Sequence, residues 1–108
     1  MSRDIRYYVT ARGACPVRSW LEELQDLKAK RTVARRIYRI IPGNFGDHKF
    51  IGGGVWEIRI DVGPGYRLYY GHIGASVVLL LCGGSKRTQT ADIRKALAYW
   101  ADYLRRMT

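Results

Sequence analysis

The sequence has few acidic residues, few histidines and only two cysteines, and it has no long apolar segment. Cys15 and Cys82 stand far apart, without the Cys/His spacing of a zinc site, and one pair of cysteines makes no disulfide scaffold. The longest apolar run, residues 77–82, is far too short to span a bilayer. We therefore expect a soluble, cytoplasmic protein that uses no metal, no cofactor and no membrane.

The shortage of acidic residues leaves the chain strongly basic. Nineteen Lys and Arg against nine Asp and Glu give a net charge of +10 in 108 residues. A small domain with this charge repels itself, and its usual use is attraction to a polyanion or to an acidic protein. Nucleic acid is the first candidate, and an inert basic surface is the alternative. An anionic membrane is disfavoured because no basic helix also carries a large exposed aromatic face.

The spacing of apolar residues predicts one domain over residues 1–108. Residues 5–10 read as a strand, and two helices follow through residue 41, as a hairpin or as one long bent helix stopped by Pro42. The glycine-rich residues 44–54 read as a loop. Three strands and a C-terminal helix complete the order β-α-α-β-β-β-α. This order predicts an α+β fold whose antiparallel sheet carries the helices on one side and leaves the other side open.

Two arginines stand on strand positions where a purely structural sheet more often carries Thr or Glu. The alternation in residues 55–61 places Glu57 and Arg59 on a polar face, and residues 66–70 place Arg67 on the corresponding face of the next strand. If these strands pair as a hairpin, Arg59 and Arg67 lie close together across the ladder. Paired guanidinium groups of this kind can hold a phosphate through several N–H donors.

Residues 55–60, 65–70 and 77–89, together with the terminal segment SKRTQTADIRKALAYW, resemble the RelE/ParE toxin superfamily. The resemblance is closest to the HigB-like branch, also described as phage Gp49-like killer proteins, and it covers nearly the whole chain. It implies the toxin of a type II toxin-antitoxin pair, held silent in a hetero-oligomer with a cognate antitoxin. RelE- and HigB-like members cut mRNA in the ribosomal A site without a metal, whereas ParE-like members poison DNA gyrase.

The resemblance assigns roles to residues on the predicted sheet and at its rim. Such cleavage needs a base for the ribose 2′-OH, cations for the scissile phosphate and an acid for the leaving oxygen. Arg59 and Arg67 fall where RelE-like toxins carry basic active-site residues, and His48 stands near the place of a histidine in HigB-like enzymes. The implied catalytic residues are Arg59, Arg67, His48 and Glu57, and the implied RNA-binding residues are Lys49, Lys86, Arg87 and Gln89.

Three positions depart from the RelE pattern. Glu57 replaces a lysine, Gln89 replaces an arginine and Ile93 replaces a tyrosine, so the acid/base set of that subgroup is incomplete. His48 is suited to the base role because its unperturbed pKa lies near neutrality, although a loop histidine is more often incidental. Glu57 is either the base or the partner of an ion pair with Arg59 or Arg67.

Three functions are compatible with these residues. The one we expect is a metal-independent endoribonuclease that inhibits translation by cutting mRNA on the ribosome. The first alternative is a ParE-like inhibitor of DNA gyrase without nuclease activity, which the missing RelE residues favour. The second is a basic RNA-binding module that does not cleave, whose binding would weaken steeply with salt.

Overall fold

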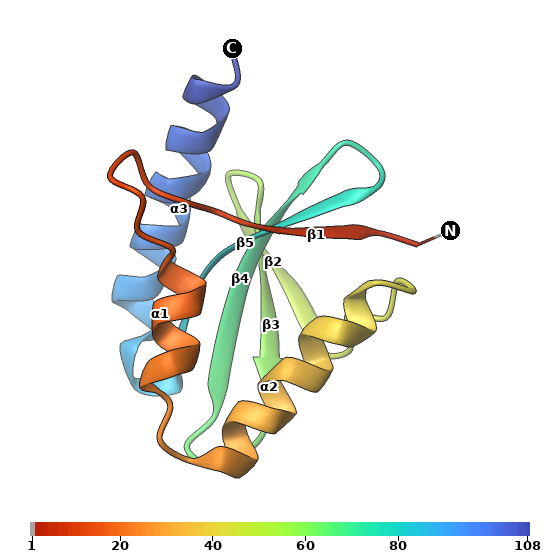
Figure 1. Cartoon of the computed structure of the whole chain (residues 1–108), viewed down its shortest axis with the longest axis vertical. Coiled ribbons are helices and arrows are strands. Elements are labelled where there is room, and N and C mark those ends of the chain that lie inside the picture. The colour runs from red at the N-terminus through yellow and green to blue at the C-terminus, as the bar shows by residue number, and fades with distance from the viewer. Residues whose placement is uncertain (1) are drawn as a thin grey trace.

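The computed structural model describes residues 2–108 (Figure 1) and confirms the α+β class. Within that range it has five strands, three α-helices and one short 3₁₀ helix. None of these helices is long and apolar enough to cross a membrane. The elements in chain order are β1 (Asp4–Tyr7), α1 (Pro16–Glu23), α2 (Leu27–Ile40), β2 (His48–Gly52), β3 (Val55–Ile60), β4 (Tyr66–Ile73), β5 (Val77–Ser85), η1 (Lys86–Thr88) and α3 (Gln89–Arg106).

The sheet is mixed, so the prediction of a purely antiparallel sheet is wrong. Its strand order is β1-β5-β4-β3-β2, and the strands from β2 to β5 form antiparallel neighbours. β1 pairs in parallel with β5, with Ile5 opposite Val78. A parallel pair needs a long crossover connection, which here consists of everything between the first strand and the last.

The glycine-rich segment at residues 44–54 contains a strand, so its prediction as a loop is also wrong. β2 pairs antiparallel with β3 and forms one edge of the sheet. Gly53 and Gly54 join the two strands with φ angles of 56° and 87°, in the left-handed region that favours glycine. The glycines therefore make a hairpin turn, and they place the preceding residues on an edge strand.

Residues 16–40 form two separate helices, so the prediction of one long bent helix is wrong. The first helix ends at Glu23, and Asp26 begins the second as its N-cap. Oδ1 of Asp26 accepts hydrogen bonds from the backbone N–H groups of Lys28 at 3.0 Å and Ala29 at 3.4 Å. This cap satisfies donors that a continuous helix would satisfy internally, so the chain can bend at this point.

Helices cover both faces of the sheet, contrary to the prediction of one open face. On one face, Ile58 and Leu68 pack in a core with α1 and α2, which lie in front of the sheet in Figure 1. On the other face, Tyr69 and Leu81 pack in a second core with α3, which includes Trp100. Side chains alternate between the two faces along each strand, so the same strands contribute apolar residues to both cores. The polar residues of β3 and β4 therefore lie under or beside α3.

Close packing of α3 on the sheet depends on a glycine in β4. A Cβ built on Gly71 would lie 2.6 Å from Cε3 of the Trp100 ring. We expect Gly71→Ala to lower the free energy of unfolding by about 1–3 kcal/mol because the buried indole must shift. Urea denaturation measures this change, and Ser76→Ala, at an exposed loop position, is the control that should stay within about 0.5 kcal/mol. Equal stabilities of the two variants would contradict this packing.

Candidate functional site

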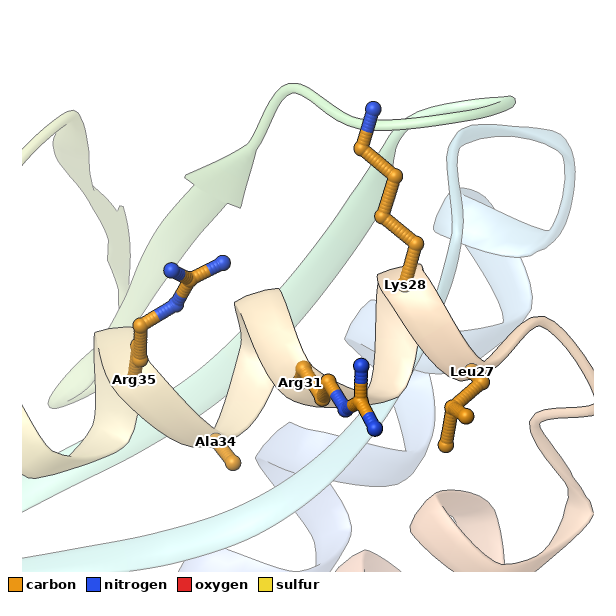
Figure 2. A pocket seen from close by; sticks show the side chains of 5 residues that line it. All are labelled: Leu27, Lys28, Arg31, Ala34 and Arg35. Atoms are coloured by element: carbon orange, nitrogen blue, oxygen red, sulfur yellow. The ribbon is translucent and has the colours of Figure 1, made fainter.

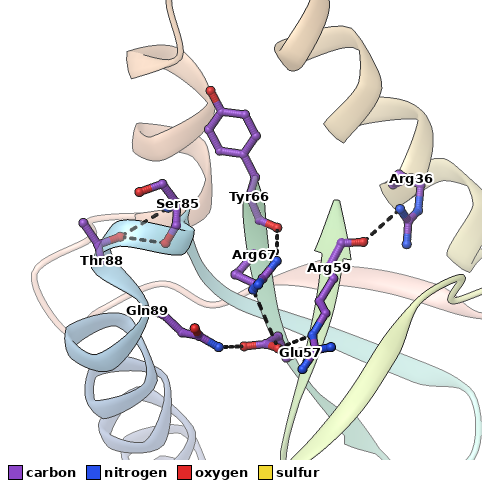
Figure 3. Close-up of polar contacts among 8 residues, drawn as sticks. All are labelled: Arg36, Glu57, Arg59, Tyr66, Arg67, Ser85, Thr88 and Gln89. Carbon is purple, nitrogen blue, oxygen red and sulfur yellow. Dashed lines mark hydrogen bonds and ion pairs between the residues drawn. The ribbon is translucent and has the colours of Figure 1, made fainter. Parts of the chain in front are cut away.

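Arg59 and Arg67 lie directly opposite each other on β3 and β4, as the alternation predicted. Figure 3 shows both side chains converging on Glu57. Nε of Arg59 donates to Oε1 of Glu57 at 3.1 Å, and Nε of Arg67 lies 3.9 Å from the same oxygen. The arginine side chains are 37% and 13% exposed, whereas that of Glu57 is fully buried. One carboxylate thus holds two guanidinium groups side by side.

Both oxygens of Glu57 are engaged by other side chains. While Oε1 faces the two arginines, Oε2 accepts a hydrogen bond of 2.9 Å from Nε2 of Gln89, in the first turn of α3. The ion-pair alternative for Glu57 is therefore what the structure shows. A fully buried carboxylate with both oxygens occupied has no access to an RNA hydroxyl, so its role is to position Arg59 and Arg67.

Arg67 keeps donors for a further ligand. The 3.9 Å separation from Glu57 is too long for a hydrogen bond, and among the described residues Nε of Arg67 has no hydrogen-bond partner. Opposite Arg67 on β5 stands Gly84, whose missing side chain makes room for the side chains of Asp92 and Thr88. Nε itself is buried, and Nη1 donates to the carbonyl oxygen of Tyr66 at 3.5 Å, so the remaining guanidinium N–H groups are the ones that can bind an anion.

A polar hollow of about 300 Å³ opens beside the two arginines. Lys86 reaches it from η1, because the backbone N–H of Lys86 donates to the carbonyl oxygen of Gly65 at 2.9 Å and fixes η1 to the β3–β4 turn. Three cations from three elements therefore surround one space, large enough for a phosphate group. The residues that line it are Asp47, Arg59, Asp61, Gly63, Pro64, Gly65, Arg67 and Lys86.

Near the arginines lie two carboxylates and a tyrosine for which the sequence predicted no role. Asp47 and Asp61 line the hollow, and both are exposed. Tyr69 is buried opposite Glu57, and its pKa is raised by burial and then by the negative charge of Glu57. Tyr69 therefore stays protonated at physiological pH. The alternation of β3 and β4 signals Asp61 and Tyr69, whereas Asp47 is brought in by β2, which the sequence did not reveal.

The remaining residues proposed from the sequence are divided between the two faces. Lys49 is exposed on β2 directly opposite Glu57, so it belongs to the arginine face. Arg87 is exposed on η1 but does not line the hollow. His48 pairs with Ile58, whose side chain faces α1 and α2. The structure therefore places His48 on the opposite face of the sheet and does not bring it together with Arg59 and Arg67.

Basic residues of α2 line a second hollow, of about 510 Å³. Figure 2 shows Lys28, Arg31 and Arg35 beside the apolar Leu27 and Ala34. This hollow is larger than the one at the arginines, but it has no carboxylate or histidine among its lining residues. It offers positive charge without the carboxylate that orients Arg59 and Arg67.

Comparison with known proteins shows a relative for most of the chain. No family model matches the sequence. The chain is 49% identical over 78 residues to an uncharacterized protein of Haemophilus influenzae. The matched region covers 72% of this chain and 79% of that protein. This chain therefore belongs to the same family as the uncharacterized Haemophilus influenzae protein.

Proposed function

We propose that this protein is the toxin of a type II toxin-antitoxin system and that it cuts mRNA on the ribosome. The observation that carries the proposal is the hollow bounded by Arg59, Arg67 and Lys86, whose two arginines are oriented by a buried carboxylate. The resemblance of the strand and terminal segments to the HigB-like branch of the RelE/ParE superfamily supports it. So does the net charge of +10, which favours binding to RNA.

In this proposal the hollow holds the scissile phosphate. The ribose 2′-oxygen loses its proton and bonds to phosphorus, the bond from phosphorus to the 5′-oxygen breaks, and that oxygen takes up a proton. Arg59 and Arg67 donate to the non-bridging oxygens and stabilise the extra negative charge of the transition state, while Lys86 adds a third positive charge. In enzymes where one such donor has been removed, the rate falls by about 10²–10³-fold.

The proton transfers need groups other than Glu57 and His48. The two carboxylate oxygens of Glu57 accept hydrogen bonds from Arg59 and Gln89, and His48 lies on the other face of the sheet. Among the residues that line the hollow, the exposed carboxylates of Asp47 and Asp61 can accept a proton. We assign the transfers to these carboxylates together with groups of the ribosome, which accounts for cleavage that depends on the ribosome.

The proposal also implies a protein partner and a compartment. A cognate antitoxin that covers the hollow with acidic side chains would offset Arg59, Arg67 and Lys86 and hold the toxin in an inactive hetero-oligomer. The proposed target, mRNA on the ribosome, places the protein in the cytoplasm. A structure of the toxin-antitoxin complex with this hollow open and unoccupied would refute this mode of inhibition.

One observation favours the ParE-like alternative, inhibition of DNA gyrase without nuclease activity. The buried ion pairs of Glu57 and the position of His48 leave the arginine site without the acid/base groups that the sequence suggested. A site that binds a phosphate without transferring protons also suits a non-catalytic RNA-binding module. Both alternatives predict intact mRNA after incubation with ribosomes.

The test is translation of a defined mRNA in a purified system with and without ribosomes, read by primer extension. We expect new 5′ ends only in reactions that contain both the protein and ribosomes, together with a loss of translation. Intact mRNA with normal translation would overturn the proposal and lead to a gyrase supercoiling assay. Intact mRNA with RNA binding that weakens steeply with salt would instead identify the non-catalytic module.

A further inference from the structure

A cluster of six aromatic rings lies on the sheet face opposite the arginine site. Phe50 on β2 stands directly opposite Trp56 on β3, which in turn stands opposite Tyr70 on β4. The ring centroids of Phe50 and Trp56 are 5.0 Å apart, and those of Trp56 and Tyr70 are 6.4 Å apart. Neighbouring rings are joined at centroid distances between 5.0 and 6.4 Å, and the members are Phe45, His48, Phe50, Trp56, Tyr70 and His72.

The inner end of this cluster is core, but its outer end is uncovered. Phe45 stacks on the buried Tyr70 at 5.2 Å and 18°, so these two rings seal the cluster against α2. Phe50 is 52% exposed, and His48 and His72 are also exposed. A large aromatic side chain that remains half exposed beside a tryptophan offers a flat surface rather than a packed core.

The charge around these rings is positive. The guanidinium of Arg3 lies 5.4 Å from the centroid of Phe45. The pKa of His72 is lowered by the partial burial of its ring and then by the positive charges of Arg3 and His48. Aromatic rings combined with cations bind the unpaired bases of single-stranded nucleic acid, whose phosphates match this charge.

The strand β2 connects this surface with the arginine site. Because side chains alternate along a strand, His48 and Phe50 face the aromatic cluster while Lys49 between them faces Glu57. β2 is also the edge of the sheet, so no further strand separates the two faces there. A single-stranded chain can pass around this edge with Lys49 beside its phosphates.

We propose that Phe50 and Trp56, flanked by His48 and His72, form a stacking platform for an unpaired base of single-stranded RNA. The phosphate chain of that RNA continues around β2, past Lys49, to the hollow at Arg59 and Arg67. This inference rests on the proposed function, because it takes RNA as the ligand. It adds residues that bind a base in the RNA segment that leads to the scissile phosphate.

The test is fluorescence anisotropy with a labelled 12-nucleotide oligouridine at low salt, at several salt concentrations. Phe50→Ala is expected to weaken binding by about 10-fold, because the variant loses one stacked base. The salt dependence should stay unchanged because no phosphate contact is lost. Phe50→Trp should retain binding and Phe50→Leu should not, which separates stacking from simple hydrophobicity. Tyr38→Ala, at a 75% exposed aromatic residue on α2, is the matched control and should bind like the wild type.

Three results would overturn the platform, and they distinguish it from the proposed function. If Phe50→Ala binds as tightly as the wild type while Arg67→Ala binds more weakly, the platform is wrong and the proposed function stands. If the wild type neither binds the oligouridine nor cuts mRNA on ribosomes, both are wrong. If Phe50→Ala leaves RNA affinity unchanged but alters the mass measured by light scattering, the surface is an interface between copies of this chain.

Discussion

Replacing Arg67 with alanine is expected to lower the rate of ribosome-dependent mRNA cleavage by about 100-fold or more. Arg67 lines the hollow, and its side chain is only 13% exposed. A donor in such a partly buried place interacts with a phosphate more strongly than one in bulk water. Primer extension over a time course in the purified translation system measures the rate.

Two further variants separate the guanidinium from general charge. Arg18→Ala removes the same charge from an exposed position on α1, and its cleavage rate should match the wild type. Arg67→Lys keeps the charge but loses the paired donors, so we expect a rate between those of Arg67→Ala and the wild type. Circular dichroism checks that each variant is folded. Wild-type cleavage by folded Arg67→Ala would show that the hollow at Arg59 and Arg67 is not the active site.

The arrangement of the arginines could be predicted from the sequence because it follows from local rules. Alternation along two strands decides which side chains share a face, and a short glycine-bearing turn brings those strands together as a hairpin. These two rules placed Glu57, Arg59 and Arg67 together, and the structure pairs Arg59 with Arg67 directly. The ion pairs of Glu57 were one of two alternatives, because the sequence does not show how deeply a carboxylate is buried.

Two of the errors, the purely antiparallel sheet and its open face, came from contacts between segments far apart in the chain. The pairing of β1 with β5 and the packing of α3 on the second face join the two ends of the sequence. Apolar stripes show that an element packs, but they do not show against which face. The sequence pattern therefore could not predict that helices cover both faces of the sheet.

The position of His48 shows how one missed strand changes a site. In sequence, His48 stands shortly before β3, and as part of a loop it was free to approach Arg59. As the first residue of β2 it pairs with Ile58 and takes the face of that residue. The exposed pattern of β2 gave no apolar alternation by which the strand could be recognised. The same strand brings Lys49 to Glu57 and places Phe50 beside Trp56.

Replacing Glu57 with alanine is expected to lower the free energy of unfolding by about 3 kcal/mol. The change removes a fully buried carboxylate and leaves two guanidinium groups facing each other without a counter-charge. This value is at the low end of the destabilisation that follows from breaking a buried ion pair, because Arg59 is 37% exposed and its charge is screened by water. Urea denaturation measures the change, and Glu22→Ala, an exposed glutamate on α1, should stay within about 0.5 kcal/mol.

A double-mutant cycle tests whether this loss comes from the arginines. Once Arg67 has been replaced by alanine, the loss caused by Glu57→Ala should be smaller by about 1 kcal/mol or more, since part of the repulsion has been removed. Glu57→Ala should also slow mRNA cleavage, because Arg59 and Arg67 lose the group that orients them. Additive losses in the cycle, or wild-type cleavage by folded Glu57→Ala, would show that the buried carboxylate does not position the two arginines.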